Sequence, residues 1–276
     1  MHTTKAVNEK EVSMKRLFVL AVVILLFCGI SSGAMLDHRY DLKQLIHGDL
    51  EPTAFSTSDF RDSSRYFAMP YANPNTTLGV VNVNSTLKKY GNASIFIKSM
   101  NSNVTVADSS EYTFGTNNHS ISTWIYFPQA VSTVYLWQHI QDVNNYDRLG
   151  ILEGATNSVT YTRVRGGVGI GTATVTYGSA FAPGIWYHVA VIQNGTDTQL
   201  YINGTAAGAS FARTGSMTDL NGPVIVGVGR ETGGIPTGPF SYYHMDEVTV
   251  LNGGIAPTID ELQGEFPLYL NGSAGG

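Results

Sequence analysis

The sequence predicts an all-β protein built as an antiparallel two-sheet sandwich or barrel. From about residue 59 to residue 265, short runs rich in Val, Ile, Thr, Tyr and Phe alternate with clusters of Asn, Gly, Ser and Asp. The chain has 30 glycines, which suit many tight turns. No long helical pattern and no internal repeat interrupt this texture. A helical bundle and a propeller are therefore disfavoured, and a sandwich or barrel is favoured.

The predicted elements follow one another in order along the chain. Residues 36–50 could form a short helix or an arm, and EPTAFSTSD reads as a linker. One turn of helix fits APTIDELQGEF near the end. The predicted strands in between are SIFIKS, NVTVAD, ISTWIYF, TVYLWQHI, SVTYTRV, TATVTY, WYHVAVI, TQLYING, PVIVGVG and DEVTVL.

The N-terminus carries the pattern of a secretory signal peptide. A basic Met14-Lys15-Arg16 precedes the apolar run LFVLAVVILLFCGI, and the small residues SSGA follow it. Cleavage is expected after Ala34, which would place the protein outside the cell or on its surface. The apolar run is shorter than the ~20 residues of a spanning helix, but an uncleaved membrane anchor stays an alternative. We therefore expect an extension with signal peptide (1–34), an arm or linker (35–57), one domain (58–265) and a polar tail (266–276).

Composition limits the possible partners and cofactors. Cys28 is the one cysteine and would leave with the signal peptide, so disulfides and thiol chemistry are not expected in the mature chain. The net charge of −5 and the 13% content of charged residues offer no basic face for phosphates. Nucleic acid is therefore not an expected partner. No membrane span is expected after the signal is removed, and no cofactor is certain.

The stretch GIWYHVAVIQNGTDTQLYING predicts a β-meander in the middle of a sheet. With a period of two, Trp186 and His188 point one way and Tyr187 and Val189 the other. Both rows are mostly apolar, so the strand should be covered on both faces. QNGTDT supplies one reversal, and Asn203 with the glycine after it supplies the next.

Five motifs in order resemble one protein family. They are DSS (62–64), KYGNASIFIKSMNSNVTVADSSEYTFGTNNHSISTWIYF (89–127), the meander itself, VIVGVGRE, and HMDEVTVLNGGIAPTIDEL (244–262). Together they are similar to laminin-G-like domains of the concanavalin A-like lectin/glucanase superfamily over about residues 58–263. The resemblance implies a jelly roll of two packed antiparallel sheets. It also implies that Trp186 and His188 are packing residues of a strand.

The sequence does not predict catalytic residues. Glycoside hydrolases of the same superfamily place two carboxylates on one face of a strand, at spacings such as E-x-D-x-x-E. Here Asp246 and Glu247 are adjacent, so a regular strand would point them to opposite faces. No G-x-S-x-G motif accompanies His188, and His139 and His244 are isolated. The chain is therefore not expected to be an enzyme, with a glycoside hydrolase or its accessory module as an alternative.

The resemblance also raises a possible structural calcium ion. The opening and closing strands of a jelly roll lie near each other, so Asp62 and Asp246 could meet there. Calcium takes six or more oxygen ligands from carboxylates and carbonyls. The alternative is that Asp246 accepts backbone hydrogen bonds at a strand start.

Aromatic and amide side chains are the candidates for ligand binding. Sugars stack their C–H faces on aromatic rings and bond their hydroxyls to amides and carboxylates. Two segments combine such groups, and binding and packing are both open for each residue. The candidates are Trp137, Gln141, Asp142, Asn144 and Tyr146 in the first segment, and Phe240, Tyr242 and Tyr243 in the second.

Taken together, these observations predict a secreted or cell-surface module that binds a glycan or a surface glycoprotein. A structural component of a cell surface or virus particle is a further alternative. In an exported chain, N-x-S/T sequons can also carry glycans. The sequons lie at Asn75, Asn84, Asn92, Asn103, Asn118, Asn194, Asn203 and Asn271.

Overall fold

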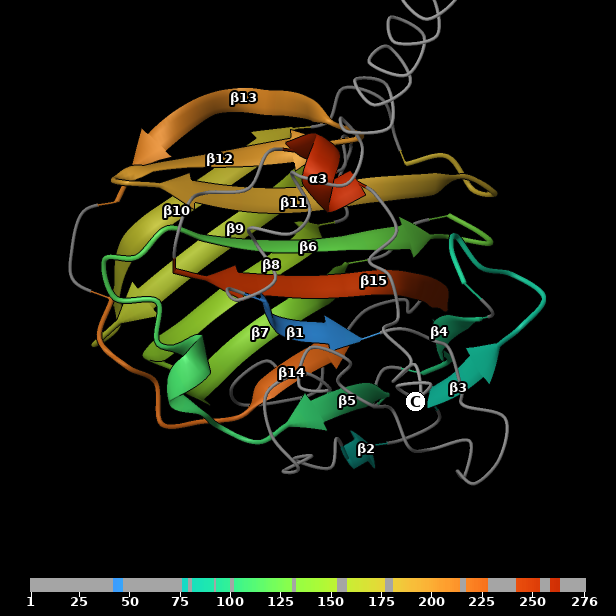
Figure 1. Ribbon diagram of the computed structural model, residues 1–276, viewed down its shortest axis with the longest axis horizontal. Coiled ribbons are helices and arrows are strands. Elements are labelled where there is room, and N and C mark those ends of the chain that lie inside the picture. Colours follow the sequence, from blue (N-terminus) through green and yellow to red (C-terminus); the bar gives the residue numbers. More distant parts are fainter. Residues whose placement is uncertain are drawn as a thin grey trace, which may run out of the picture. The chain divides into compact units, whose positions relative to one another are not determined.

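The computed structural model describes a two-sheet antiparallel β-sandwich. The described residues are 42–46, 76–78, 81–91, 93–99, 102–130, 133–152, 158–176, 181–213, 217–227, 242–253 and 259–263. All of them fall within one compact unit, Asp41–Gly276. Almost every described element is a strand, so the predicted all-β sandwich is confirmed (Figure 1).

The first sheet has eight strands and contains the predicted meander. Its order is β13-β12-β11-β6-β15-β4-β3, with β1 paired to β15 beside this path. Every described neighbour pair is antiparallel. The strands are β1 (Leu42–Ile46), β3 (Val81–Asn84), β4 (Ser94–Ile97), β6 (His119–Tyr126), β11 (Trp186–Asn194), β12 (Asp197–Ile202), β13 (Thr205–Ala212) and β15 (Tyr243–Asn252).

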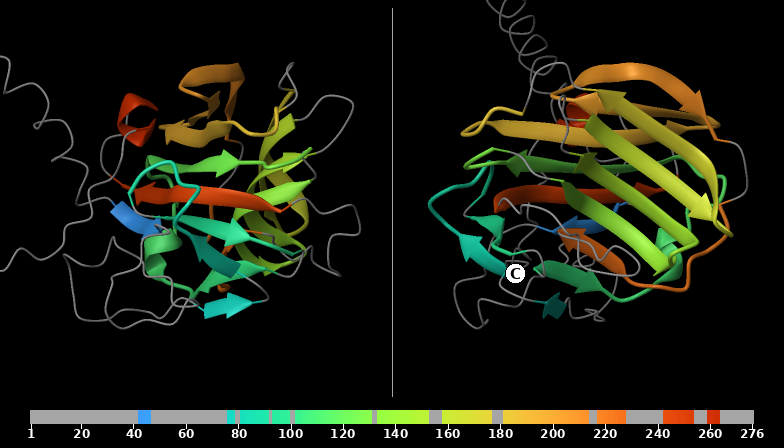
Figure 2. Two further views of the ribbon diagram at one scale, coloured as in Figure 1. Left: turned by 90° about the vertical axis from the view of Figure 1, so that its right-hand side faces the viewer. Right: turned by 180° about the vertical axis from the view of Figure 1, so that it is seen from behind.

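The second sheet has seven strands in the order β10-β9-β8-β7-β14-β5-β2. Its four long strands run diagonally behind the first sheet in Figure 1 and face the reader in the right-hand view of Figure 2. The strands are β2 (Thr76–Leu78), β5 (Asn103–Val106), β7 (Val134–Asp142), β8 (Asn145–Leu152), β9 (Ser158–Arg165), β10 (Val168–Thr176) and β14 (Val224–Gly227).

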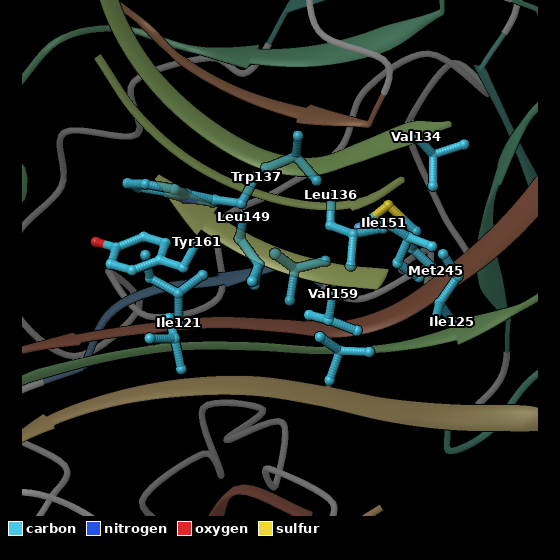
Figure 3. Close-up of a cluster of buried hydrophobic side chains, with 14 of the residues drawn as sticks. Ile121, Ile125, Val134, Leu136, Trp137, Leu149, Ile151, Val159, Tyr161 and Met245 are labelled. Atoms are coloured by element: carbon cyan, nitrogen blue, oxygen red, sulfur yellow. The ribbon is translucent and has the colours of Figure 1, made fainter. Parts of the chain in front are cut away.

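One hydrophobic core fills the space between the sheets. Alternate residues of each strand point inward, as the period of two requires. Ile121 and Ile125 of β6 enter this core from the first sheet, and Leu149 and Ile151 of β8 enter it from the second (Figure 3). These side chains are almost fully excluded from water. Burial of this shared core is what holds the two sheets together.

The meander prediction for the middle of a sheet is confirmed. β11 lies between β6 and β12, and most of its residues are buried. Tyr187 and Val189 face the main core, whereas Ala190 and Ile192 form a second small cluster on the opposite face. Leu262 of the short helix α3 (Ile259–Gln263) belongs to this second cluster. α3 is the single helical turn that the sequence predicted near the end.

Part of residues 36–50, for which the sequence allowed a short helix or an arm, is a strand. Leu42–Ile46 is strand β1, paired antiparallel with β15. A helix of five or six residues has little stability of its own. The open edge of β15 beyond β4 offers unpaired backbone groups, and pairing with them satisfies the backbone of this segment. The sandwich therefore includes a strand that lies before the predicted domain start at residue 58.

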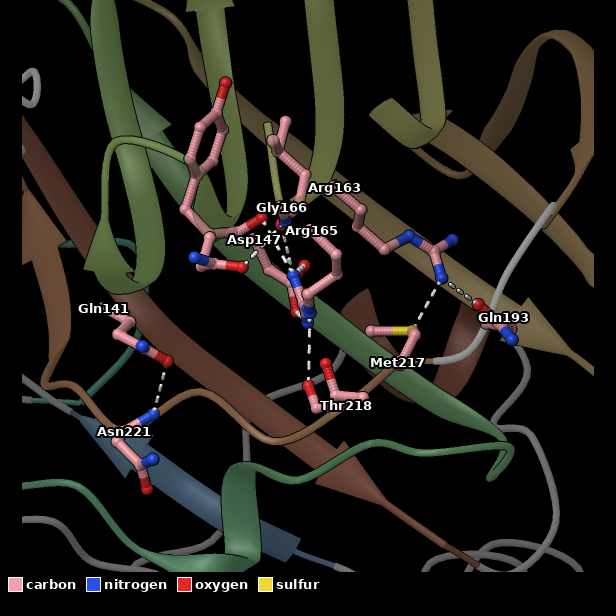
Figure 4. Close-up of polar contacts among 12 residues, drawn as sticks. Gln141, Asp147, Arg163, Arg165, Gly166, Gln193, Met217, Thr218 and Asn221 are labelled. Atoms are coloured by element: carbon pink, nitrogen blue, oxygen red, sulfur yellow. Dashed lines mark hydrogen bonds and ion pairs between the residues drawn. The ribbon is translucent and has the colours of Figure 1, made fainter. Parts of the chain in front are cut away.

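A buried arginine stands between the two sheets at one end of the sandwich. Arg163 of β9 has no exposed surface. Its guanidinium donates hydrogen bonds to Gln193 Oε1 at 2.6 Å, Thr198 Oγ1 at 2.7 Å and Met217 Sδ at 2.9 Å (Figure 4). Its charge also lies over the Tyr161 ring, 4.9 Å from the centroid. Neutral acceptors and ring faces therefore solvate a charge that burial would otherwise make costly.

Gly222, just before β14, lies very close to the backbone of β7. A Cβ at this position would lie 2.0 Å from the backbone oxygen of Ile140. We expect Gly222→Ala to lower the free energy of unfolding by about 1–3 kcal/mol, because the backbone of β7 must move. Urea unfolding would measure the change. Gly169→Ala is the control, since its nearest neighbour would lie at an ordinary 3.9 Å. Equal stability of the two variants would contradict this packing.

Candidate functional site

The turn between β7 and β8 holds several of the predicted binding residues. The Asp142 carboxylate accepts a hydrogen bond from the Asn144 backbone at 2.7 Å and from Asn145 Nδ2 at 2.9 and 3.1 Å. Gln141 Oε1 accepts the backbone N–H of Asn221 at 3.2 Å (Figure 4). These oxygens brace the turn, as Asx turns do. The exposed Val143 side chain stands at its tip.

A second turn, between β9 and β10, is attached to the first. Gly166 N donates to Asn145 Oδ1 at 2.9 Å, and Gly167 N donates to the Asn144 carbonyl at 2.9 Å. Below them, Arg165 contacts both carboxylate oxygens of the buried Asp147, at 2.9 and 3.0 Å. A bidentate pair of this kind fixes geometry as well as adding energy. The two turns therefore form one braced end of the second sheet.

The outward-facing side chains of β7 to β10 lie in rows across the second sheet. They alternate with the core residues drawn in Figure 3, so they point away from the first sheet. Their register is set by the pairing of four successive strands. We call the two central rows, with Tyr146 beside them, the Arg148 face: Gln138, Arg148, Thr162 and Thr172 in one row, and Tyr135, Gly150, Thr160 and Thr174 in the next.

Arg148 lies over two aromatic rings at the centre of this face. Its guanidinium carbon lies 4.1 Å from the Tyr135 ring centroid and 4.6 Å from that of Tyr146. Its Nε donates to Gln138 Oε1 at 3.0 Å. Gly150 leaves room for this arrangement, because a Cβ there would lie 2.9 Å from Cδ1 of Tyr135. Stacking on two rings orients the guanidinium without using its outer N–H groups.

Hydroxyl groups continue the face across β9 and β10. Thr160 Oγ1 lies 3.3 Å from both Thr162 Oγ1 and Thr174 Oγ1. Thr172 and Thr174 are exposed, and Thr162 is half-buried. Thr160 is buried and holds its neighbours, whereas the other three hydroxyls can donate to and accept from the hydroxyls of a ligand.

The structure places the predicted binding residues in different parts of the fold. Trp137 and Tyr243 are buried in the core at 1% and 0% exposure, so packing is the role seen for both. Tyr146 belongs to the Arg148 face, and Gln141, Asp142 and Asn144 lie on the turn beside it. Tyr242 is 39% exposed on the first sheet. Phe240 lies outside the described residues.

Tyr242 begins a separate strip of aromatic rings on the first sheet. It packs edge-on against Phe96 at 5.8 Å, and Phe96 stacks on His244 at 4.2 Å. Tyr126 continues the strip to Trp186, with ring centroids 5.5 Å apart. The described contacts of these rings are mostly with one another, although all of them except Phe96 carry a polar group. Ring packing is the role that these contacts show.

Asp246 is a hydrogen-bond acceptor in the middle of the first sheet. Its Oδ2 accepts the backbone N–H groups of Lys89 at 2.9 Å and Tyr90 at 3.1 Å, and its Oδ1 accepts that of Glu247 at 3.0 Å. This is the alternative role considered for Asp246. Asp62 lies outside the described residues, and the described part of the chain contains no cluster of three His, Cys, Asp or Glu suited to a metal. The calcium ion stays a prediction.

Glu247 departs from the regular strand that the sequence analysis assumed. The register of β15 against β6 shifts between Asp246 and Thr249, and Glu247 has a φ of 50°. A non-glycine residue rarely adopts this left-handed conformation, so the strand contains a bulge here. Simple alternation therefore does not place these two carboxylates. Asp246 and Glu247 are nevertheless 1% and 2% exposed, and neither lies open to a sugar.

His188 is a buried strand residue. Its ring centroid lies 5.1 Å from that of Trp124, and its backbone N–H donates to Asn203 Oδ1 at 2.8 Å. Burial lowers the pKa of His188 to about 4, so it is neutral at pH 7. This geometry fits the packing role that the resemblance implied.

The predicted glycan acceptors differ in accessibility. Asn103 is 5% exposed and its Oδ1 accepts a hydrogen bond from Thr105. Asn84 and Asn118 are half-buried and cap nearby backbone N–H groups. Asn194 and Asn203 are exposed at the two turns of the meander. Asn75, Asn92 and Asn271 lie outside the described residues, and modification stays a prediction for the others.

The predicted signal peptide, residues 1–34, also lies outside the described residues. Among the helices that the structure does describe, none is long and apolar enough to cross a membrane.

Comparison with known proteins identifies the family of this fold. The laminin-G-type model of the concanavalin A-like lectin/glucanases superfamily matches residues 98–258. The chain belongs to this superfamily. The resemblance found in the sequence and the jelly-roll sandwich that it implied are both confirmed. A comparison with curated protein sequences gives no significant match.

Solved structures of binding domains share the superfamily fold of this chain. The binding domain of Paraclostridial Mosquitocidal Protein 1 is 15% identical, with a TM-score of 0.58 over 81% of this chain and 51% of that domain. A structure described as "Cell entry of botulinum neurotoxin type C is dependent upon interaction with two ganglioside molecules" is 13% identical, with a TM-score of 0.56 over 83% and 53%. The chain thus spans about half the length of these toxin structures.

A third solved structure matches over more of its own length. Domain 4 of AbnA, a GH43 extracellular arabinanase from Geobacillus stearothermophilus, was solved in complex with arabinotriose. It is 16% identical, with a TM-score of 0.51 over 68% of this chain and 86% of that domain. At these identities the likeness concerns the fold alone.

The role of Asp246 can be tested by removing its charge. We expect Asp246→Asn to lower the free energy of unfolding by about 2–4 kcal/mol, because backbone N–H groups lose a charged acceptor. Urea unfolding in EDTA and in excess calcium would measure the loss. The same loss in both solutions is expected from the observed hydrogen bonds. A loss confined to the calcium solution would mean that Asp246 acts mainly as a metal ligand.

Buried histidines should make the fold sensitive to acid. Burial lowers the pKa of His119 to about 3, with a further effect from the charge of Arg163, and lowers that of His188 to about 4. Both pKa values are lower in the folded chain than the ordinary value of 6.5. The fold therefore has its full stability above pH 6.5 and loses stability below it, because only the unfolded chain takes up protons there. Between pH 6.5 and about 5, each of the two histidines should lower the free energy of unfolding by about 1–2 kcal/mol.

Urea unfolding at a series of pH values would measure this loss of stability. His188→Gln should show a shallower decline than the unmodified chain over the same range, because one titrating ring has been removed. A profile that stays flat from pH 6.5 to about 5 would contradict the buried, neutral state of these rings.

Proposed function

We propose that this chain is a non-catalytic binding module that recognises a glycan through its Arg148 face. The observation that carries the proposal is the half-buried Arg148 guanidinium, which lies over the buried Tyr135 ring and the half-buried Tyr146 ring, beside rows of threonine hydroxyls. Stacked rings, a planar donor and hydroxyls are the groups that bind sugars. The face lies on paired strands rather than on a loop, so its groups are held in fixed positions.

Two comparisons support a carbohydrate ligand. The arabinanase domain binds arabinotriose, and the neurotoxin structure is described by its interaction with gangliosides. Both share the superfamily fold with this chain, although fold alone does not determine function. A binding role also agrees with the burial of Asp246 and Glu247, since a glycoside hydrolase needs two carboxyl groups open to the sugar. The alternative enzymatic function therefore has less support.

Export is the second part of the proposal. The basic, apolar and small-residue segments before residue 35 have the order of a secretory signal. A glycan-binding module acts where glycans are displayed, so a secreted or cell-surface location fits the same function. N-terminal sequencing of the exported protein would test this, with Met35 as the expected first residue. Recovery of an uncleaved chain in the membrane fraction would favour the anchor instead.

Glycan binding can be tested with matched tyrosine variants. We expect the chain to retain at least one oligosaccharide on a glycan array and to release no reducing sugar from it. Tyr146→Ala should weaken binding about 5- to 50-fold, because the ring and the position of Arg148 are lost together. Tyr242→Ala is the control, since it removes an exposed tyrosine from the other sheet. Isothermal titration with the retained oligosaccharide would measure both.

Three outcomes would contradict the proposed function. Loss of binding in Tyr242→Ala but not in Tyr146→Ala would place the site on the first sheet. Release of reducing sugar, abolished by Asp246→Asn or Glu247→Gln in folded protein, would make the chain an enzyme. Absence of binding to every glycan by a folded chain would remove the carbohydrate ligand.

A further inference from the structure

We propose that the Arg148 face selects sugars that carry a carboxylate, such as uronic or sialic acid residues, and that Arg148 binds the carboxylate with two parallel hydrogen bonds. This inference rests on the proposed function and narrows it to a class of ligand. It starts from the N–H groups of this face that no acceptor among the described residues uses.

Most N–H groups of the Arg148 guanidinium make no hydrogen bond within the described part of the chain. Within the described part of the chain, its guanidinium makes one hydrogen bond, from Nε to Gln138 Oε1 at 3.0 Å. An arginine side chain carries five N–H groups and no acceptor, so the others are available at this half-buried position. No acidic side chain neutralises Arg148 among the described residues, since the described ion pairs involve Asp108 and Asp147. The face therefore presents an uncompensated positive charge.

The guanidinium is also pre-oriented. The rings of Tyr135 and Tyr146 contact it at 4.1 and 4.6 Å, and Gln138 fixes its Nε. Contacts with ring faces leave the in-plane N–H groups free to point to a ligand. Two parallel N–H groups match the two oxygens of a planar carboxylate better than they match a hydroxyl. A fixed guanidinium loses little side-chain entropy when it binds.

Gln138 supplies an independent observation. This side chain is fully buried, and its Nε2 has no hydrogen-bond partner among the described residues. Its Oε1 accepts from Arg148, so the same amide holds the arginine with one end and has an unused donor at the other. Buried amide groups in proteins are nearly always bonded. Because this amide is fixed in the sheet, it holds the neighbouring guanidinium in one position.

The surrounding side chains suit an acidic sugar in particular. Apart from Arg148 itself and Asp142 at the end of β7, the described outward positions of β7 to β10 carry hydroxyl, amide, aromatic and aliphatic groups. Asp147, next to Arg148 in sequence, points to the other side of the sheet and pairs with Arg165. Asp142 is bound within its own turn. Thr162 is directly opposite Arg148 in the register, where its hydroxyl can reach the ring hydroxyls of the same sugar.

The overall charge of the chain would not by itself attract an acidic sugar. The net charge is −5, so an anionic glycan is repelled by the molecule as a whole. Selective binding of an acidic sugar would then require a local cation held in a defined geometry. Arg148 is such a cation.

Titration with matched sugars tests this inference. The purified full chain would be titrated with glucuronate and glucose, galacturonate and galactose, and sialyllactose and lactose. We expect the acidic member of at least one pair to bind about 10- to 100-fold more tightly, as a hydrogen-bonded charge pair would give. Arg148→Met should remove this preference while weak binding of the neutral member remains. Arg148→Lys should restore little of it, because an ammonium lacks the planar fork.

The control variant is Lys98→Met, which removes one positive charge from the residue that follows β4 of the other sheet. It should keep the preference for the acidic sugar. Thermal unfolding would establish that all three variants are folded. A preference lost equally in Lys98→Met and Arg148→Met would reduce the effect to overall charge and overturn the inference. Stronger competition by inorganic phosphate than by glucuronate would assign the site to phosphate groups and overturn it as well.

The inference and the proposed function fail in different ways. Equal binding of acidic and neutral sugars, unaffected by Arg148→Met but weakened by Tyr146→Ala, would overturn the acidic class and keep a glycan-binding face. Absence of binding to either member of every pair, and to the wider array, would overturn both.

Discussion

The carboxylate of Asp246 is the contact on which the arrangement of the first sheet depends. β15 lies between β6 and β4 near the end of the chain, and all ten of its residues are buried. Asp246 connects this strand to the backbone of Lys89 and Tyr90, which are 157 and 156 residues earlier. The same carboxylate accepts the N–H of Glu247, where the bulge begins. One side chain thus fixes both the loop before β4 and the irregularity of the central strand.

The bulge at Glu247 has an energetic cost that this contact offsets. A left-handed φ in a non-glycine residue costs on the order of 1–3 kcal/mol and persists where the surroundings hold it. Here the surroundings include the Asp246 carboxylate before it and the hydrogen bond from Thr249 Oγ1 to the Glu247 carbonyl after it. β1 then pairs with the part of β15 that follows the bulge. The early arm and the late strand are thereby joined in one sheet.

The second sheet separates stability from recognition along the same strands. In β8, Leu149 and Ile151 enter the core, whereas Arg148 and Gly150 face outward. The outward residues can therefore be specialised for a ligand without altering the core. The braced turns at one end, with Asp147 and Arg165 beneath them, keep the strands in register and so keep the rows aligned. Rigid placement of binding groups follows from the packing of the other face.

Sequence reasoning succeeded where a pattern is local. The Trp186–Ile192 alternation and the Asn-Gly turn identified the meander without any knowledge of its neighbours. It did not identify β8, which begins with the polar run Asn-Tyr-Asp-Arg, or β13, which is rich in Ala and Gly and poor in β-branched residues. Both strands are defined by the partners they pair with, and pairing is not visible in local composition.

The candidate site was only partly visible for the same reason. Tyr146 and the turn beside it were predicted, because aromatic and amide residues cluster there in sequence. Arg148, Gln138 and the threonines were not, because they become neighbours only through the register of four strands. The alternation of Thr160 with Thr162, and of Thr172 with Thr174, is the signal that could have drawn attention to them. Trp137 was misleading, since a large ring on a strand serves a core as well as a ligand.

The buried guanidinium of Arg163 has a consequence for how this sequence can vary. Arginine stays protonated in proteins, so the charge remains when one of its acceptors is replaced. Gln193, Thr198 and Met217 come from three separate segments, yet they share one cation. An apolar replacement at one position is tolerated only while the others still solvate that charge. If Arg163 itself is replaced by an apolar residue, the polar side chains around it lose their partner and become destabilising in the buried interior. Substitutions at these four positions should therefore be correlated among relatives.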